Sequence, residues 1–75
     1  MDNNWIKASE RMPTESEEYL VVIKQGSNSY IELCDFSKEK NCFSCWDNYY
    51  DCWITYKQED ILYWMKIPEY KNLEK

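Results

Sequence analysis

Histidine is absent from this 75-residue chain, and glycine and arginine occur once each, as Gly26 and Arg11. Without histidine, the chain cannot form the Ser-His-Asp or Cys-His arrangements that activate many nucleophiles near neutral pH. A phosphate-binding loop is also excluded, because such loops need several glycines. We therefore expect that the protein is not an enzyme.

Positive charge is scarce as well. Nine basic and fourteen acidic residues give a net charge of −5 and a pI of about 4.6, so phosphate backbones and anionic membranes would be repelled. No apolar run approaches the roughly 20 residues of a membrane-spanning helix. Residues 1–4 lack the basic and apolar regions of a signal peptide. We expect a cytoplasmic protein that contacts neither nucleic acid nor membrane directly.

The cysteines are spaced C-x7-C-x2-C-x6-C, at Cys34, Cys42, Cys45 and Cys52. A cytosolic location favours reduced thiols over disulfides. Only Cys42-Phe43-Ser44-Cys45 has the spacing of a zinc-binding hook, which is half of the usual motif. We expect no cofactor, with thiols that are either buried or exposed, and a structural zinc site at these four residues is the alternative.

Strand-forming residues occur in short runs, separated by polar turn residues at intervals typical of antiparallel sheets. Residues 19–23 are all β-branched, aromatic or leucine, a pattern that favours a strand covered on both faces. Gly26 lies in the turn that follows, and the next run places Ile31 and Leu33 on one face. Further runs cover residues 42–46, 52–56 and 61–65.

These runs predict a mainly β fold, an antiparallel meander of four to five strands in one small domain at residues 1–75. At most one short helical turn is expected near the N-terminus, at residues 9–11. Residues 1–4 and 70–75 are expected to fray, because few apolar side chains tie them down.

Two terminal motifs are distinctive: Trp5-Ile6 with Ser9-Glu10-Arg11-Met12-Pro13, and the closing run at residues 60–69 that contains Trp64-Met65-Lys66-Ile67-Pro68. They resemble the DUF551 family, small proteins of unknown function carried by bacteriophages and bacterial genomes. Tyr63 stands where that family often has histidine, and Lys66 replaces the first proline of its closing motif. The resemblance implies no activity. We interpret Trp5 and Trp64 as packing residues that join the first and last strands in one core.

The most unusual local feature is an eight-residue segment with four aromatic rings and two carboxylates. Exposed rings give a contact surface, and nearby carboxylates favour a basic partner. The alternative is that the tryptophans fill the core and the tyrosines surround it. A second acidic patch is expected at Glu17 and Glu18. The residues of the segment that we expect to bind a partner are Trp46, Asp47, Tyr49, Tyr50, Asp51 and Trp53.

These observations favour a non-catalytic protein-interaction module of phage or prophage origin that binds a host protein in the host cytoplasm. A narrower form of the hypothesis is an anti-CRISPR or anti-restriction inhibitor, whose carboxylates occupy the basic nucleic-acid channel of a defence protein. The alternatives are a small-molecule or carbohydrate binder with stacked aromatics, a self-associating domain that dimerises through its strand edges, and a zinc-stabilised mini-domain.

Overall fold

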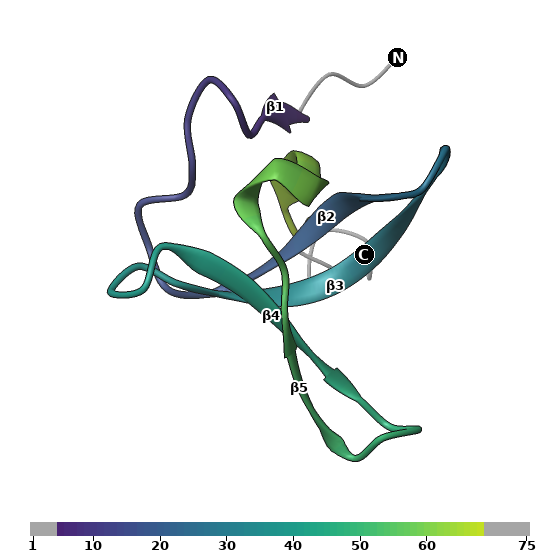
Figure 1. Ribbon diagram of the computed structural model, residues 1–75. Coiled ribbons are helices and arrows are strands. Elements are labelled where there is room, and N and C mark those ends of the chain that lie inside the picture. The colour runs from purple at the N-terminus through teal and green to yellow at the C-terminus, as the bar shows by residue number, and fades with distance from the viewer. Residues whose placement is uncertain (1–4, 69–75) are drawn as a thin grey trace, which may run out of the picture.

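The computed structural model describes residues 5–68 and folds them into one antiparallel sheet in the order β1-β6-β2-β3-β4-β5 (Figure 1). The mainly β fold is confirmed, with six strands in place of the expected four to five, because Ile6 and Lys7 pair with β6. The strands are β1 (Ile6–Lys7), β2 (Glu18–Gln25), β3 (Asn28–Ser37), β4 (Cys42–Asp47), β5 (Cys52–Thr55) and β6 (Ile61–Lys66).

Helical structure within residues 5–68 is limited to one 3-10 turn, η1 (Gln58–Asp60). The helical turn expected at residues 9–11 is a hydrogen-bonded turn, in which the Lys7 carbonyl accepts from the amides of Glu10 and Arg11 at 3.0 and 3.2 Å. The expected fraying of residues 1–4 and 70–75 concerns residues outside the described range.

The β2 strand is the centre of the sheet. It pairs with β3 along its whole length, from Glu18 opposite Asp35 to Gln25 opposite Asn28. Gly26 opens the two-residue turn between them with φ 62°, a conformation that glycine adopts without steric cost. On its other side β2 pairs with β6, so the last strand closes the sheet against the first hairpin.

The core lies on one face of this sheet. Alternate residues of β2 point into it, and residues of β3, β4 and β6 share that face because paired residues in a sheet point the same way. The turn after β1 covers it, with Ala8 and Met12 packed against the core and the Trp64 indole Nε1 donating to the Arg11 carbonyl at 2.9 Å. The core residues are Tyr19, Val21, Ile23, Cys34, Phe36, Phe43, Cys45, Ile61 and Trp64.

The opposite face of β6, β2 and β3 is here called the outer face. The sequence predicted that this face of the β2 strand would be covered, but in the structure it is only partly covered. Leu20 and Val22 are half-buried, and Ile31 and Leu33 are exposed. The interpretation of Trp5 as a core residue is also wrong. The first and last strands do pair, with Ile6 opposite Trp64, but Trp5 lies outside the core cluster and lines a hollow with Val22, Ile31 and Tyr63.

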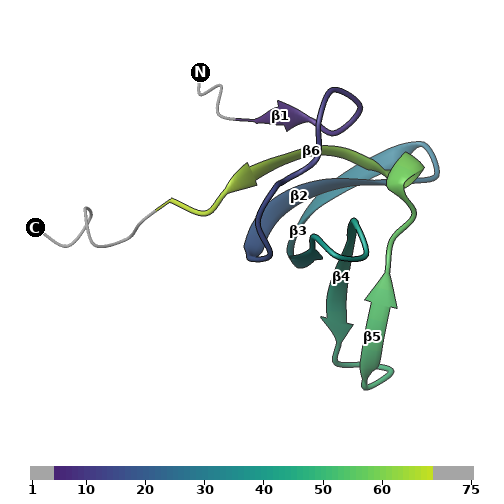
Figure 2. The same cartoon turned by 90° about the vertical axis from the view of Figure 1, so that its left-hand side faces the viewer.

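The β4–β5 hairpin leaves the rest of the sheet. Its first strand pairs with β3 only through Cys42, Phe43 and Ser44. Beyond these residues the hairpin runs on alone, and Figure 2 shows it extending away from β2 and β6. Phe43 and Cys45 keep the base of the hairpin in the core, while its far end projects from the body.

Truncation of Phe43 to alanine should largely unfold the domain. The Phe43 side chain is 0% exposed, and a Phe→Ala cavity costs about 3–5 kcal/mol, comparable with the whole stability of a domain this small. Urea denaturation followed by circular dichroism measures the change. The exposed Tyr49→Ala variant is the control, with an expected change of at most about 1.5 kcal/mol from the loss of its ring pair with Tyr50. A Phe43→Ala protein as stable as this control would contradict the assigned core.

Candidate functional site

Four aromatic side chains stand exposed at the far end of the β4–β5 hairpin, and we call them the aromatic tip. Their exposed fractions are 45% for Trp46, 85% for Tyr49, 70% for Tyr50 and 56% for Trp53. The alternative in which the two tryptophans fill the core is therefore wrong. Four exposed rings at one projection form a concentrated apolar surface in contact with solvent.

The rings hold one another in place as two edge-to-face pairs. Trp46 and Trp53 are opposite each other on β4 and β5, with ring centroids 5.6 Å apart and an interplanar angle of 77°. Tyr49 and Tyr50 meet at 4.8 Å and 86°. Such pairs contribute about 0.5–1.5 kcal/mol beyond the area they bury. The tip therefore presents its rings in a restricted set of orientations.

The loop that carries the tyrosines is set by two aspartates. Asp47 Oδ1 accepts hydrogen bonds from the amides of Tyr49 at 2.8 Å and Tyr50 at 3.2 Å, which forms an Asx-type turn. Asp51 closes the loop with φ 57°, a conformation that aspartate tolerates better than most residues. Asp47 is thus half-buried and shapes the loop, whereas Asp51 is exposed.

Charge around the aromatic tip has one sign. Residues 42–56 contain no lysine or arginine, and their acidic residues are Asp47 and Asp51. Glu18 pairs with Asp35, which in turn pairs with Ser44 at the hairpin base, so Glu18 shares a face with Trp46 and Trp53.

The second acidic patch predicted from the sequence is divided by the structure. Glu18 lies in line with Asp35 and Ser44, on the side of the sheet that continues into the hairpin. Glu17 instead lies beside Lys66 of β6, with Oε2 4.0 Å from Nζ. Both partners of this ion pair are well exposed, so it contributes little to stability.

A second cluster, which the sequence analysis missed, lies on the inner side of the hairpin. Cys45 Sγ donates to Glu32 Oε2 at 3.6 Å, and the Tyr56 hydroxyl lies 3.9 Å from Cys45 Sγ and 3.5 Å from the Tyr30 hydroxyl. These residues line a cleft of about 390 Å³ that reaches Tyr49. The alternation of β3, which places Tyr30 and Glu32 on the face of Cys34, was the available signal.

The thiols of Cys45 and of its neighbour Cys34 are kept protonated by their surroundings. Burial, with Cys45 and nearby carboxylates adding to it, raises the pKa of Cys34 far above its ordinary value. Burial also raises the pKa of Cys45 and of the Tyr56 phenol. A thiol that stays protonated is a poor nucleophile and a poor metal ligand. The cluster therefore has the properties of a partly polar packing site.

The possible zinc ligands do not converge. Cys34 and Cys45 are neighbours, but Cys42 lies opposite Ser37 at the start of β4 and Cys52 is exposed opposite Asp47. Among residues 5–68 no three Cys, Asp or Glu side chains gather in a way that could hold a metal ion.

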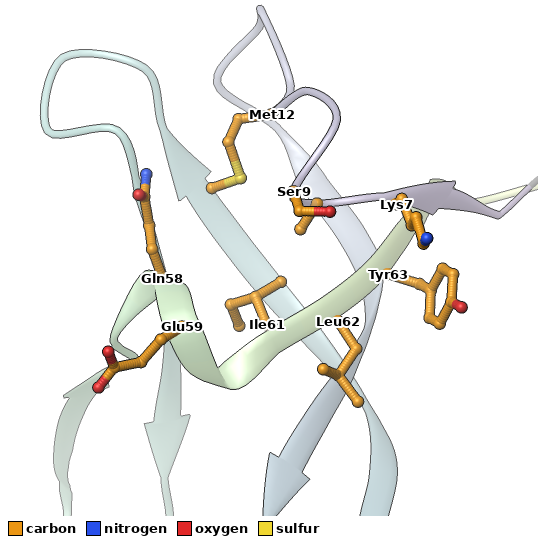
Figure 3. A pocket seen from close by; sticks show the side chains of 9 residues that line it. Lys7, Ser9, Met12, Gln58, Glu59, Ile61, Leu62 and Tyr63 are labelled. Carbon is orange, nitrogen blue, oxygen red and sulfur yellow. The ribbon is translucent and has the colours of Figure 1, made fainter.

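A wider hollow of about 700 Å³ lies between the segment after β1 and the start of β6. Figure 3 shows Met12 and Ile61 directed into it, with Lys7 and Glu59 at its two ends. The two charged lining residues are thus separated. The hollow contains none of the residues predicted from the sequence to bind a partner.

The fold and this surface define a small all-β domain whose distinctive exposed feature is an acidic, aromatic hairpin. The chain belongs to the family described as "Protein of unknown function (DUF551)", whose model matches residues 4–70. The resemblance seen in the terminal motifs is thereby confirmed. No curated protein and no solved structure matched the chain. Within the described residues, no helix has the length and apolarity needed to cross a membrane.

Stability should fall at alkaline pH because of Cys34. Burial raises the pKa of this thiol in the folded protein, whereas the unfolded thiol titrates near its ordinary value of 9.0. The contribution is fully present below pH 9.0 and is lost as the pH rises above it. The loss is at most about 1.4 kcal/mol per pH unit for one group. Melting temperatures from pH 7 to 11 measure it.

The control for this titration is a matched pair of cysteine variants. Cys34→Ala should show a shallower alkaline decline than the wild type, while Cys52→Ala, which removes an exposed thiol, should keep the wild-type slope. Equal slopes for all three proteins would show that Cys34 does not cause the alkaline decline.

Proposed function

We propose that this protein is a non-catalytic interaction module that binds another protein through the aromatic tip. The observation that carries the proposal is the exposure of Trp46, Tyr49, Tyr50 and Trp53 together on one hairpin. A domain with a small core gains stability by burying rings. Four rings left in solvent, on a projection that the core does not need, favour a role in binding.

The way the rings are held supports this proposal. Tryptophan and tyrosine supply much of the binding energy at protein interfaces, because each buries a large area and loses few rotamers. The edge-to-face pairs and the Asp47 turn fix the tip before it meets a partner. Ordering the tip on binding then costs little conformational entropy.

The charge of the tip indicates the kind of partner. Asp51 is exposed beside the rings, and residues 42–56 carry no positive side chain. A surface of this sign is complementary to a basic patch and accelerates association with it. We therefore propose a partner whose binding site is basic and contains an apolar recess for the rings.

In its narrower form, the proposal is that the partner is a nucleic-acid-binding defence protein of a bacterial host, inhibited by a phage or prophage product. The acidic tip and the net charge of −5 support this form. The phage origin is supported by the family resemblance of the terminal motifs.

Alanine at Tyr49 and Tyr50 together should abolish capture of the partner. The wild-type protein, immobilised as bait, is expected to retain one stoichiometric protein from bacterial lysate, identified by mass spectrometry. With that partner purified, removal of two anchoring rings should raise the dissociation constant about a hundredfold or more, at a typical 1–2 kcal/mol per ring.

The matched control for this experiment is Ile31→Glu, which alters an exposed residue of the outer face and leaves the hairpin unchanged. It should bind the partner with wild-type affinity. Equal binding by the wild type and the tyrosine variant, or no specific partner for the wild type, would contradict the proposed function.

The defence-protein form makes a separate prediction about salt. If Asp51 and Glu18 stand in a basic nucleic-acid channel, the affinity should fall as salt rises from about 50 mM to 500 mM, because exposed charges are screened. An oligonucleotide ligand of the partner should compete with the protein for binding. Salt-independent binding without competition would leave an interaction module but exclude the occupation of a nucleic-acid channel.

A further inference from the structure

The outer face carries a regular apolar surface that the aromatic tip does not include. Strand register places two rows across β6, β2 and β3. One row is Tyr63, Val22 and Ile31, and the other is Leu20 and Leu33, with the buried Met65 beside Leu20. Ile31 is 59% exposed, Leu33 48% and Tyr63 39%. Trp5 extends the surface beyond β6, and a shallow hollow of about 340 Å³ lies between Trp5, Val22, Ile31 and Tyr63.

Charges lie on the same face at both ends of these rows, and they differ in sign. Lys24 follows Val22 at one end of β2, whereas Glu18 precedes Leu20 at the other. On β3, Asp35 lies opposite Glu18 and adds to the acidic end, while the neutral Ser29 lies opposite Lys24. Lys7 of β1 lies opposite Tyr63 and therefore at the margin of the same face, beside the apolar rows. Across β6, β2 and β3 the face is apolar in the middle, basic at one end of β2 and acidic at the other.

This distribution is complementary to itself under one two-fold rotation. We propose that the outer face is the interface of a homodimer, in which two copies pack face to face about an axis that crosses the strands above Val21. Residues equally distant from Val21 along β2 then meet: Val22 faces Leu20 of the second copy, and Lys24 faces Glu18.

The register of the neighbouring strands fits the same axis. Val21 is paired with Glu32 on β3 and with Trp64 on β6, so the axis passes over the middle of each apolar pair. Ile31 then faces Leu33 of the second copy, and Tyr63 lies over the β6 position occupied by the buried Met65. A two-fold axis along the strands would instead bring Lys24 against Lys24 and Glu18 against Glu18, which like-charge repulsion disfavours.

The sequence of β2 agrees with a covered outer face. Leu20 and Val22 alternate with the buried Tyr19, Val21 and Ile23, so the strand has apolar residues on both faces. Antiparallel strands of this kind occur where two sheets pack as a sandwich, with their strands aligned to within about 30°. The second copy supplies the missing sheet.

The size of the face sets the strength of the dimer. Three strands at about 4.8 Å spacing and seven residues at about 3.4 Å each give a patch of about 14 Å by 24 Å. Two such patches have a combined area of roughly 700 Å², which is below the range of stable interfaces and fits a weak, transient one. We therefore expect a reversible dimer with a dissociation constant in the range of about 1–100 µM.

Sedimentation equilibrium of the purified chain, at about 1 µM to 1 mM, tests the proposal. The wild type should pass from monomer to dimer in this range. Ile31→Glu places two carboxylates in the apolar centre and should raise the dissociation constant about a hundredfold. Circular dichroism confirms that each variant is folded. A wild type that stays monomeric at 1 mM, or a dimer indifferent to Ile31→Glu, would overturn the proposal.

A charge exchange tests the axis. Lys24→Glu and Glu18→Lys should each weaken the dimer about tenfold, because each places like charges together at two symmetric positions. The double variant should restore wild-type dimerisation. Lys24 and Glu18 are six residues apart on one strand, about 20 Å, and cannot pair within one chain. Additive weakening in the double variant would exclude this axis.

The Tyr49→Ala/Tyr50→Ala variant separates this proposal from the function of the aromatic tip. It should dimerise as the wild type does, because Tyr49 and Tyr50 lie in the loop between β4 and β5, beyond the rows on β6, β2 and β3. A monomeric tyrosine variant would show that the hairpin forms the dimer contact, and the homodimer proposed here would be wrong.

Discussion

The Tyr19 ring is the contact on which the rest of the fold depends. It is 2% exposed and meets Trp64, Phe43 and Phe36 edge to face, at centroid distances of 5.2, 6.2 and 6.3 Å. These partners come from β6, β4 and β3, so one side chain of β2 joins four strands. Its hydroxyl donates to the Glu15 carbonyl at 2.9 Å, which also fixes the segment before β2. A core of few residues gains its cohesion from this one ring.

Local patterns predicted much of this structure. The strand at residues 19–23, the turn at Gly26 and the placement of Ile31 and Leu33 on one face each appear in the structure, although the strand is not covered on both faces as predicted. The sequence indicated the segment that contains Trp46 and Trp53 as a candidate contact surface and left core packing of the two tryptophans open, and the structure shows both exposed. These features depend on neighbouring residues, and local sequence carries that information.

Other features depend on which strands meet, and the sequence alone could not predict them. The proximity of Cys34 to Cys45 follows from the register of β3 against β4, in which the neighbouring Asp35 and Ser44 are paired, and no local pattern reports that register. The same holds for Trp5, which lies on the outer face because β1 pairs with β6 in one register and not its neighbour. The use of Asp47 to shape a turn, and not as a free carboxylate, likewise appears only with the fold.

The projection of the β4–β5 hairpin separates the core of the domain from its exposed aromatic tip. Its buried residues end at Cys45, so the segment from Trp46 to Trp53 can change in sequence or length at little cost to the core. The terminal motifs that place the chain in its family lie in the other part of the molecule, at β1 and β6. A fold divided in this way can take up changes in the hairpin without rebuilding its core. It also offers a natural site for grafting foreign peptide loops onto a stable scaffold.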